Sequence, residues 1–580
     1  MSRPTASVTY VNITRVSATL LLAASLVAPA QADPVSWTGP LSTRGRWIVD
    51  AHGDRFKLKS GNWHGASGTW NGSGDINDPA NHHAGEKADQ VPLGLDRATM
   101  TTIINSFKDI GVNSVRLPFS NQMIKDANPV NGLKDPQLNG KRPLEIYDAV
   151  VDELTSNNLA VILNNHTTTS RWCCGVDGNE RWNTSQSTGQ WVNDWAFMAD
   201  RYKANKRVVG ADLYNEVRRN IWDDPNWGWG DDHDWFKASQ QAADRIQQTA
   251  PDLLVIVEGI NWTGIPVDGF AHGRPTLEPV RYLSHTLANP GKLVYSAHFY
   301  GYTGPNHSGA TGTGETSDPR YQDLSPQELT DVLQRQAFYL TEAQKHFTAP
   351  LWVSEFGVGG IDESNQKARA WFERFVDHLI ANDTDFAYWP LVGFHTNRTG
   401  NSWALLRWDA AGNRISVNDG DDWRATAWNR LVTAPQRSGQ IPRETRWNML
   451  TKESCPQSEK LIGISHTGNR GLCVSGPQWS DTTRVTDEQY VTDDWAVGYT
   501  KLQCPQGNAA VGYANFTLVC APVAQGSSSR VLWFDRGDNR PDQGGDWANG
   551  HYKGQCAQDE HIAGVAYNWR RTPDALLCRK

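Results

Sequence analysis

Two glutamates in this chain stand at the ends of short apolar runs. If such a run is a buried strand, its last residue lies at the solvated edge of the sheet. Glu216 ends the run Leu213-Tyr214-Asn215-Glu216, and Glu355 follows Leu351-Trp352-Val353-Ser354. A single carboxylate at such a place is weak evidence, because rims are solvated and glutamate is common there. Two carboxyl groups can act on opposite sides of one bond, and retaining cleavage of a glycoside requires them roughly 5 to 5.5 Å apart.

Other strand ends carry side chains that could bind a sugar. Parallel barrels present catalytic groups at the C-terminal ends of their strands, so these residues would meet the two glutamates at one rim. Each has a plainer alternative: a structural salt bridge, a histidine satisfied within the core, or a tryptophan that packs the barrel. The candidate substrate-binding residues are Arg116, His166, Asn215, His298, Tyr300, Trp389 and Trp63.

The elements that must position these residues lie between about Lys57 and Ala434. There short apolar runs alternate with amphipathic helical patterns, which is typical of βα units, and we count eight of them. No glycine-rich phosphate loop follows the first strand, so the pattern favours an α/β fold of the closed (β/α)8 TIM barrel type over a doubly wound sheet. The predicted strands are Lys57 to Trp63, Ser114 to Phe119, Ala160 to His166, Val208 to Glu216, Leu253 to Gly259, Lys292 to Tyr300, Pro350 to Gly357 and Asp385 to Phe394.

Two of the predicted helices have recognisable ends. In the first, we expect Asp96 as the N-cap and Gly111 as the stop. In a later one, Ser325-Pro326-Gln327-Glu328 forms a capping box with proline at the first helical position. The apolar face expected for the first helix consists of Met100, Ile103, Ile104 and Phe107.

The ordered series of arginine, histidine, Asn-Glu, His-x-Tyr, glutamate and tryptophan resembles glycoside hydrolase family 5. The resemblance spans roughly Trp37 to Ala434, and Gly61-Asn62-Trp63 and Val257-Glu258-Gly259 agree with it more loosely. It implies a retaining β-glycosidase that hydrolyses O-glycosyl bonds through a covalent intermediate, and that works on a carbohydrate without a cofactor or a metal ion. The family acts on several β-glycans and small glycosides, so the substrate sugar, the linkage and endo or exo action stay open.

A retaining mechanism assigns distinct roles to the two glutamates. Glu355 would attack as a carboxylate, and we expect Arg116 and Tyr300 beside it to hold its charge. Glu216 must begin protonated, which calls for a raised pKa, and then act as a base toward water. The remaining expected roles are a hydrogen bond from Asn215 to the sugar 2-hydroxyl, orientation of Glu216 by His298, a hydroxyl contact from His166, and a stacking floor formed by Trp389.

The N-terminus and the overall charge indicate an exported protein with an uncharged partner. An apolar stretch from Ala18 to Ala28 precedes Ala30-Gln31-Ala32, which predicts a signal peptide over residues 1–32. A membrane anchor is the alternative, but the stretch is shorter than the roughly 20 residues of a spanning helix. A net charge of −8, from 55 basic and 63 acidic residues, is too mixed to suggest nucleic acid or an anionic membrane. We expect an extracellular monomer.

A second domain follows the barrel domain, which we place at residues 33–434. The sequence over residues 435–446 is rich in polar and turn-forming residues and predicts a linker. Residues 447–580 then repeat three times a pattern of cysteine, apolar-Gly-apolar triplet and second cysteine, which predicts a small all-β module of the β-prism or β-trefoil type. The simplest of 15 connectivities pairs Cys455 with Cys473, Cys504 with Cys520 and Cys556 with Cys578. The module either binds glycans or only stabilises the chain.

Several other residues stay open. Cys173 and Cys174 are adjacent and would form either a strained disulfide or two free thiols. Residues 418–422 look faintly like a calcium loop, but the closing glutamate of such a loop is absent. Further stacking candidates are Trp172, Trp182, Trp229, Trp262 and Trp403.

Two rival functions use the same residues. A transglycosylase would pass the sugar from the covalent intermediate to another sugar or alcohol, and nothing in the sequence excludes it. An inactive carbohydrate-binding protein would rely on the C-terminal module, and the intact pair of glutamates argues against it. A serine hydrolase is excluded because no Gly-x-Ser-x-Gly elbow stands at a strand end.

Overall fold

The structure is a computed structural model of the whole chain. It describes residues 37–580 except 69–89, 172–177, 221–222, 262–276, 282, 286, 288, 308–316, 344–346, 360–365, 394–402, 410, 421, 442–453, 467–469, 515, 524–525, 527, 536–551 and 558. The predicted signal peptide, Cys173 and Cys174 lie outside these residues. Among the described residues, no helix combines the length and the apolar character that a membrane crossing requires.

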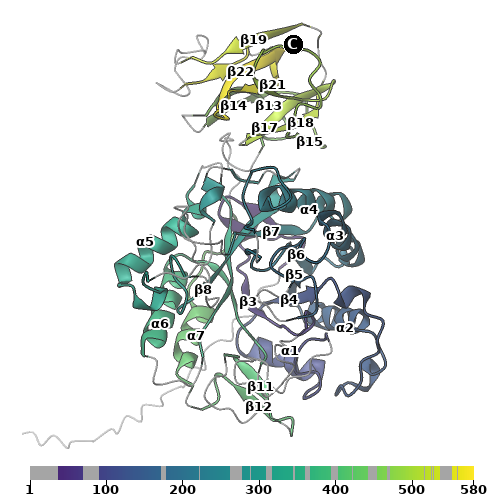
Figure 1. Cartoon of the computed structure of the whole chain (residues 1–580), viewed down its shortest axis with the longest axis vertical. Coiled ribbons are helices and arrows are strands. Elements are labelled where there is room, and N and C mark those ends of the chain that lie inside the picture. The colour runs from purple at the N-terminus through teal and green to yellow at the C-terminus, as the bar shows by residue number, and fades with distance from the viewer. Residues whose placement is uncertain are drawn as a thin grey trace, which may run out of the picture. The chain divides into compact units, whose positions relative to one another are not determined.

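A closed barrel of parallel strands forms the first domain, as the sequence predicts (Figure 1). The strands follow chain order around the barrel, with β10 closing it against β3. Nearly every strand residue is buried, because the strands pack inward on one another and outward on helices. The strands are β3 (Lys59–Asn62), β4 (Ser114–Ser120), β5 (Ala160–Thr167), β6 (Val208–Asp212), β7 (Leu254–Glu258), β8 (Leu293–Tyr300), β9 (Leu351–Gly357) and β10 (Asp385–Tyr388).

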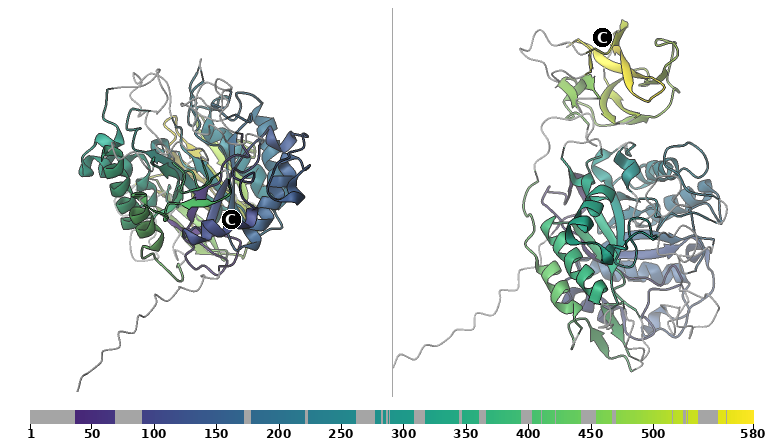
Figure 2. Two further views of the ribbon diagram at one scale, coloured as in Figure 1. Left: turned by 90° about the horizontal axis from the view of Figure 1, so that it is seen from below. Right: turned by 60° about the vertical axis from the view of Figure 1, so that its left-hand side comes forward.

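Helices surround the barrel in Figure 1 and in both views of Figure 2. One α-helix follows each strand except β7, after which the described residues contain the short 3-10 helix η3 (Glu278–Arg281). The apolar faces of these helices and the outer faces of the strands share one large hydrophobic core. The helices are α1 (Met100–Asp109), α2 (Pro143–Ser156), α3 (Thr188–Tyr202), α4 (Trp235–Thr249), α5 (Pro326–Gln336), α6 (Gln366–Ala381) and α7 (Arg424–Thr433).

The predicted helix ends are confirmed in part. Ser325 and Glu328 form the reciprocal capping box of α5, and Gly111 follows α1 with a φ of +86°, a value that glycine adopts without strain. The N-cap of α1 is Thr99, whose side chain accepts a hydrogen bond from the amide of Thr102. The prediction of Asp96 as the N-cap is wrong, because Asp96 lies in the turn over residues 93–97 that precedes the helix.

The first part of the predicted linker belongs to the barrel domain. The backbone amide of Ile441 donates to Gly53, and Gln440 bonds the carbonyl of His52. Ile441 is also buried. Residues 435–441 are therefore attached to the N-terminal part of the barrel domain, and the rest of the linker lies outside the described residues.

The C-terminal module consists of short antiparallel strands arranged in three sheets. Each sheet is built on the hairpin of one repeat, which fits the predicted prism better than the trefoil. All three predicted disulfides are present. The strands are β13 (Glu459–Ser465), β14 (Arg470–Ser475), β15 (Thr483–Val485), β16 (Thr500–Gln503), β17 (Asn508–Ala514), β18 (Thr517–Pro522), β19 (Ser529–Trp533), β20 (Gly554–Gln555), β21 (His561–Tyr567) and β22 (Pro573–Arg579).

The three repeats exchange strands in a closed cycle. The amide of Cys455 in the first repeat donates to Val511 in the second, at 2.7 Å. The amides of Cys504 and Cys556 make the corresponding bonds to the third repeat and back to the first, at 2.8 and 2.7 Å. Each repeat therefore completes the sheet of another, so a single repeat could not fold by itself.

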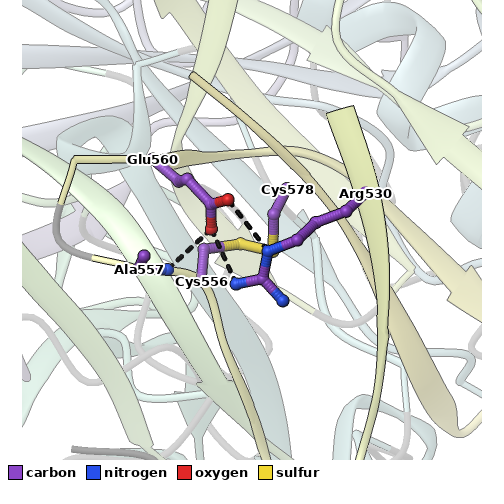
Figure 3. Close-up of a disulfide and its surroundings, with 5 residues drawn as sticks. All are labelled: Arg530, Cys556, Ala557, Glu560 and Cys578. Atoms are coloured by element: carbon purple, nitrogen blue, oxygen red, sulfur yellow. Dashed lines mark hydrogen bonds and ion pairs between the residues drawn. A yellow bond between two sulfur atoms is a disulfide. The ribbon is translucent and has the colours of Figure 1, made fainter. Parts of the chain in front are cut away.

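The disulfide of the third repeat has a partly exposed ion pair beside it (Figure 3). Both carboxylate oxygens of Glu560 accept hydrogen bonds from Arg530, at 2.9 and 2.8 Å, and one also accepts from the amide of Ala557. The sulfurs of Cys556 and Cys578 are bonded to each other, so they offer no thiolate to a metal ion despite their closeness to Glu560.

Candidate active site

Glu355 lies at the end of β9, and both of its carboxylate oxygens are held by hydrogen bonds. The guanidinium of Arg116 donates to one oxygen at 2.6 Å, and the hydroxyl of Tyr300 donates to the other at 2.7 Å. All three side chains are almost completely buried. Charge-assisted bonds of this kind are short and hold a carboxylate in one orientation.

Arg116 is itself fixed from four directions. It donates to Asp212 at 2.6 Å, to Asn62 at 3.0 Å and to Asn215 at 2.9 Å, in addition to Glu355. Burial acts to lower the pKa of Arg116, but the carboxylates of Asp212 and Glu355 outweigh it and raise that pKa. The guanidinium therefore stays charged in the fully buried site.

Glu216 follows β6 in a left-handed backbone conformation, with a φ of +47°. Such a conformation costs a residue other than glycine about 1–3 kcal/mol and is characteristic of functional sites. A bond of 2.9 Å from the Glu216 amide to Glu258 holds the backbone, and the Glu216 carboxyl lies 3.0 Å from Nδ1 of His298. The predicted orientation of Glu216 by His298 is thus seen as a direct contact.

The two glutamates face each other across a short gap. One oxygen of Glu216, one nitrogen of His298 and one oxygen of Glu355 all lie within 4.8 Å of one another. This spacing suits a retaining mechanism and is too short for an inverting one, which needs roughly 6.5 to 9.5 Å. The three groups could also face a metal ion, but Arg116 already balances the charge of Glu355.

A register shift in the barrel sets this geometry. Ala297 of β8 pairs with Val353 of β9, but the next residue, His298, pairs with Glu355. One residue, Ser354, is therefore bulged, and Glu355 lies directly opposite His298. Bulges commonly redirect a side chain beside an active site.

The histidines of the site differ in charge. Burial, reinforced by the positive charge of Arg116, lowers the pKa of His166 well below its ordinary value, so its ring is neutral. Burial also acts to lower the pKa of His298, but the negative charges of Glu258 and Glu355 and the hydrogen bond with Glu216 raise it. His298 is therefore the histidine that carries a proton most readily.

Trp389 and His166 form a stacked pair of rings. Their rings are parallel within 7°, with centroids 5.3 Å apart, and the ring of His64 lies 5.0 Å from Trp389. Nδ1 of His166 lies 2.9 Å from the side-chain oxygen of Asn164, which fixes the ring. Tyr300, which donates to Glu355, has a second aromatic neighbour, because the Trp403 ring lies 5.9 Å from its own.

Two aromatic predictions are wrong. Trp63 is completely buried, its indole N–H donates to Leu93, and its ring packs edge-on against Phe107 of α1. Because strand side chains alternate, Asn62 points into the barrel and Trp63 outward to the helices. Trp182 is likewise fully buried, in the core against Trp235.

The remaining tryptophans that were predicted to stack on sugar rings lie in different environments. Trp229 is 75% exposed, and Trp403 stands near Tyr300 as described. Trp172 and Trp262 lie outside the described residues.

The site contains residues to which sequence reasoning gave no role. Asp212 anchors Arg116, and Asn62 accepts from the same guanidinium. His64 packs on Trp389, and Glu258 lies beneath Glu216. Alternation along the strands could have indicated Asn62 and His64, because they flank the outward-facing Trp63. Asp212 ends β6, but it lies three residues before the Asn215-Glu216 pair and has no pattern of its own that marks it as a site residue.

A closed βα barrel that brings an oxygen of Glu216, after β6, within 4.8 Å of an oxygen of Glu355, in β9, defines a class of protein, the retaining glycosidases. Comparison with known proteins agrees with this class. Residues 50–394, more than half of the chain, match the family described as Cellulase (glycosyl hydrolase family 5). The chain belongs to glycosyl hydrolase family 5, and it is a retaining β-glycosidase that hydrolyses O-glycosyl bonds.

Two of the related proteins are endoglucanases by name, and a third is named only for the family. An "Endoglucanase" of Paenibacillus polymyxa is 29% identical over 419 residues, which cover 69% of this chain and 87% of that protein. The "Major extracellular endoglucanase" of Xanthomonas campestris pv. campestris is 29% identical over 302 residues, covering 50% of this chain and 54% of that protein. A "Glycosyl hydrolase 5 family protein" of Chamaecyparis obtusa is 26% identical over 384 residues, covering 62% of this chain and 60% of that protein.

Solved structures share the barrel fold. The hyperthermophilic endocellulase of Pyrococcus horikoshii superposes with a TM-score of 0.53 at 22% identity, over 68% of this chain and 99% of that one. The catalytic domain of the Xanthomonas enzyme superposes with a TM-score of 0.51 at 24% identity, over the same shares of the two chains. Structures of the Pyrococcus enzyme include complexes with cellotetraose.

Proposed function

We propose that the protein is an endo-acting β-glucan hydrolase in which Glu355 is the nucleophile and Glu216 the acid/base. The observation that carries this assignment is the asymmetry between the two carboxyl groups. Glu355 is bound by the cation of Arg116 and the hydroxyl of Tyr300, which suits a charged nucleophile. The Glu216 carboxyl lies 3.0 Å from Nδ1 of His298, a group that can exchange a proton with it, which suits an acid/base. The endo action and the glucan substrate rest on the names of the relatives.

The first half of the reaction forms an ester. An oxygen of Glu355 bonds to the anomeric carbon while the bond from that carbon to the leaving oxygen breaks, and Glu216 gives its proton to the leaving oxygen. Arg116 keeps hold of the Glu355 carboxyl group throughout and so keeps it aimed at the reacting carbon. Asn215, which Arg116 orients, is the group proposed to bind the 2-hydroxyl of the sugar.

The second half of the reaction hydrolyses the ester on Glu355. Glu216, now a carboxylate, takes a proton from water as the water oxygen bonds to the anomeric carbon and the ester to Glu355 breaks. His298, within reach of both glutamates, can follow the movement of charge from one to the other. A sugar hydroxyl in place of water would give transglycosylation, so product analysis at high sugar concentration distinguishes the two outcomes.

The test of the two assignments uses azide as a replacement nucleophile. Glu355→Ala should be inactive alone and, with azide, convert an activated β-glycoside into the inverted glycosyl azide. Glu216→Ala should keep the first step on an activated glycoside and give a retained glycosyl azide. If both variants gave azides of the same configuration, the assignment of the two roles would be wrong.

The substrate is tested with soluble β-glucan. Endo action predicts a rapid fall in viscosity with few new reducing ends, and release of oligosaccharides. Mannan and xylan serve as controls for the sugar. Turnover of mannan or xylan alone would contradict the glucan assignment without affecting the mechanism.

Export is part of the proposal. Three disulfides in the C-terminal module suit an oxidising compartment, and one relative is named as extracellular. The predicted cleavage after Ala32 can be checked by N-terminal sequencing of the secreted protein. The predicted monomer is checked by light scattering.

We also propose that the C-terminal module binds glucan chains through aromatic rings at one end of a sheet. Trp569, in the turn from β21 to β22, is 85% exposed, and Trp533, the last residue of β19, is 51% exposed. Tyr499 directly precedes β16, and its ring lies 5.2 Å from that of Trp533. Strand pairing places all three residues at the same end of the sheet β16-β21-β22-β19. Exposed aromatic faces of this kind suit sugar rings.

Adsorption to insoluble cellulose tests this second function. The double variant W533A/W569A should lose most adsorption while its activity on soluble glucan is unchanged. Val497, an exposed apolar residue of the same module, provides the control, and Val497→Ala should adsorb like the wild type. Equal adsorption of all three proteins would favour the alternative of a stabilising appendage.

A further inference from the structure

Glu258 is a buried carboxyl group directly beneath Glu216 that the mechanism above leaves without a role. It ends β7, and its side chain is 0% exposed. One carboxyl oxygen accepts the bond from the Glu216 amide at 2.9 Å. The other lies 3.4 Å from Nδ1 of His298, the same nitrogen that lies 3.0 Å from the Glu216 carboxyl. Glu258 thus contacts both the backbone of Glu216 and the partner of its side chain.

Burial favours the neutral form of Glu258. Burial raises the pKa of Glu258 to about 8; His298 and Arg116 oppose this rise, and the negative charges of Glu216 and Asp212 add to it. These four residues are the charged groups that act on it: His298 of β8, Asp212 of β6, Glu216 after β6, and Arg116 of β4. A neutral carboxyl adds no charge to a site that already contains three other acidic side chains.

We propose that Glu258 is a positioning residue for Glu216 and that it acts through the two contacts of its carboxyl group. One oxygen of this group holds the Glu216 backbone in the left-handed conformation, and its second oxygen faces His298, so that the Glu216 carboxyl stays aimed at the leaving oxygen. The inference rests on the acid/base role proposed above for Glu216.

Asp212 shows why this role differs from that of an ordinary buried carboxylate. Asp212 is also 0% exposed and ends the neighbouring strand β6, but it pairs with the guanidinium of Arg116 at 2.6 Å. Its charge is balanced by a cation that in turn holds Glu355. Asp212 therefore serves the nucleophile side as a charged group, whereas Glu258 serves the acid/base side through its two contacts.

The two roles predict different dependence on the leaving group. A leaving group of low pKa departs without a proton, so a poorly aimed Glu216 matters little for it. A leaving group of high pKa needs the proton, and general acid catalysis contributes about 10²- to 10⁴-fold there. A defect on the nucleophile side slows both kinds of substrate alike.

The experiment compares four variants on aryl β-glycosides with good and poor leaving groups, at pH 6. Glu258→Ala should lower kcat/KM at least tenfold for the poor leaving group and less than about threefold for the good one. Glu258→Gln, which keeps a neutral carbonyl acceptor, should recover most of the loss. Asp212→Ala should lower kcat/KM for both substrates, and Asp212→Asn should not recover it, because the charge is missing.

Each other result has a definite meaning. Equal losses on both leaving groups for Glu258→Ala, or no rescue by glutamine, would overturn the proposal. If Glu258→Ala does not fold, Glu258→Asp takes its place, since the shorter side chain withdraws the carboxyl from the Glu216 amide, and the same dependence on the leaving group is expected. Glu216→Ala is measured in parallel. If Glu216→Ala itself showed no such dependence, the proposed function would fail, and not only the role of Glu258.

Discussion

Arg116→Lys is expected to separate the geometry of the site from its charge. Three nitrogens of the Arg116 guanidinium donate four hydrogen bonds, to Asp212, Asn62, Glu355 and Asn215. A lysine ammonium keeps the positive charge but concentrates its donors at one point, so it cannot reach acceptors on different edges of a guanidinium. Both stability and catalysis should suffer, by amounts that follow from the lost bonds.

The loss of stability can be worked out from the bonds that lysine cannot make. If the ammonium stays between the two carboxylates, the side-chain oxygens of Asn62 and Asn215 lose the donor that Arg116 provides. Each costs about 1–3 kcal/mol, so the barrel loses about 2–6 kcal/mol. At roughly 2 °C per kcal/mol for a large domain, the melting transition of the barrel falls by about 4–12 °C. A displaced Glu355 should lower kcat/KM about hundredfold, the usual effect of a misplacement near 1 Å.

Calorimetry and kinetics on the full chain test both numbers, with Arg55→Lys as the matched control. Arg55 is also buried and pairs with a buried carboxylate, Asp385, at 3.0 Å. It makes none of the contacts described for the two glutamates, so Arg55→Lys should lower the melting transition but leave kcat/KM near the wild-type value. An Arg116→Lys protein that melts within 1 °C of the wild type and keeps a third or more of its kcat/KM would refute the reasoning.

Two further predictions concern stability. The double variant Cys504→Ala/Cys520→Ala removes a disulfide with a sequence separation of 16. Calorimetry should show that the C-terminal module loses about 3 kcal/mol of stability. A reducing-sugar assay should show unchanged activity on soluble glucan. Burial lowers the pKa of His378 from 6.5 to about 4. Between these pH values the unfolded chain therefore binds more protons than the folded chain. The free energy of unfolding should fall by about 3 kcal/mol in all as the pH drops from 6.5 to 4. His378→Gln should flatten that part of the curve of melting temperature against pH, and an unchanged slope would exclude His378 as its source.

The barrel could be predicted because its signals are local. Each strand is a short apolar run, and the two glutamates stand at the ends of runs where a parallel barrel must place catalytic groups. The disulfide pairing could be predicted because a cysteine, an apolar-Gly-apolar triplet and a second cysteine recur in that order three times, although the separations of the paired cysteines are 18, 16 and 22. The cyclic exchange of strands among the repeats could not, because it joins residues far apart, such as Cys455 and Val511, through backbone bonds that leave no mark on residue type.

The errors at the site have the same origin. Trp63 and Trp182 have rings that suit a sugar, but residue type does not fix where a side chain points. In a strand that depends on which face of the sheet the residue occupies, and in a loop it depends on the path of the backbone. Glu258 agrees with the family resemblance only loosely, and its role could not be predicted. That role depends on two contacts between strands, with Glu216 and His298. The neutral form of Glu258 is favoured by burial, which composition and spacing do not reveal.

The central claim, that Glu355 forms a covalent bond with the substrate, can be tested by trapping the intermediate. An activated 2-deoxy-2-fluoro β-glucoside or β-cellobioside slows both steps, and its good leaving group lets the ester accumulate. Digestion and mass spectrometry should find one added sugar, on the peptide that contains Glu355, and none after the substitution Glu355→Ala. A sugar on another residue, or turnover with inversion and no adduct, would contradict the account.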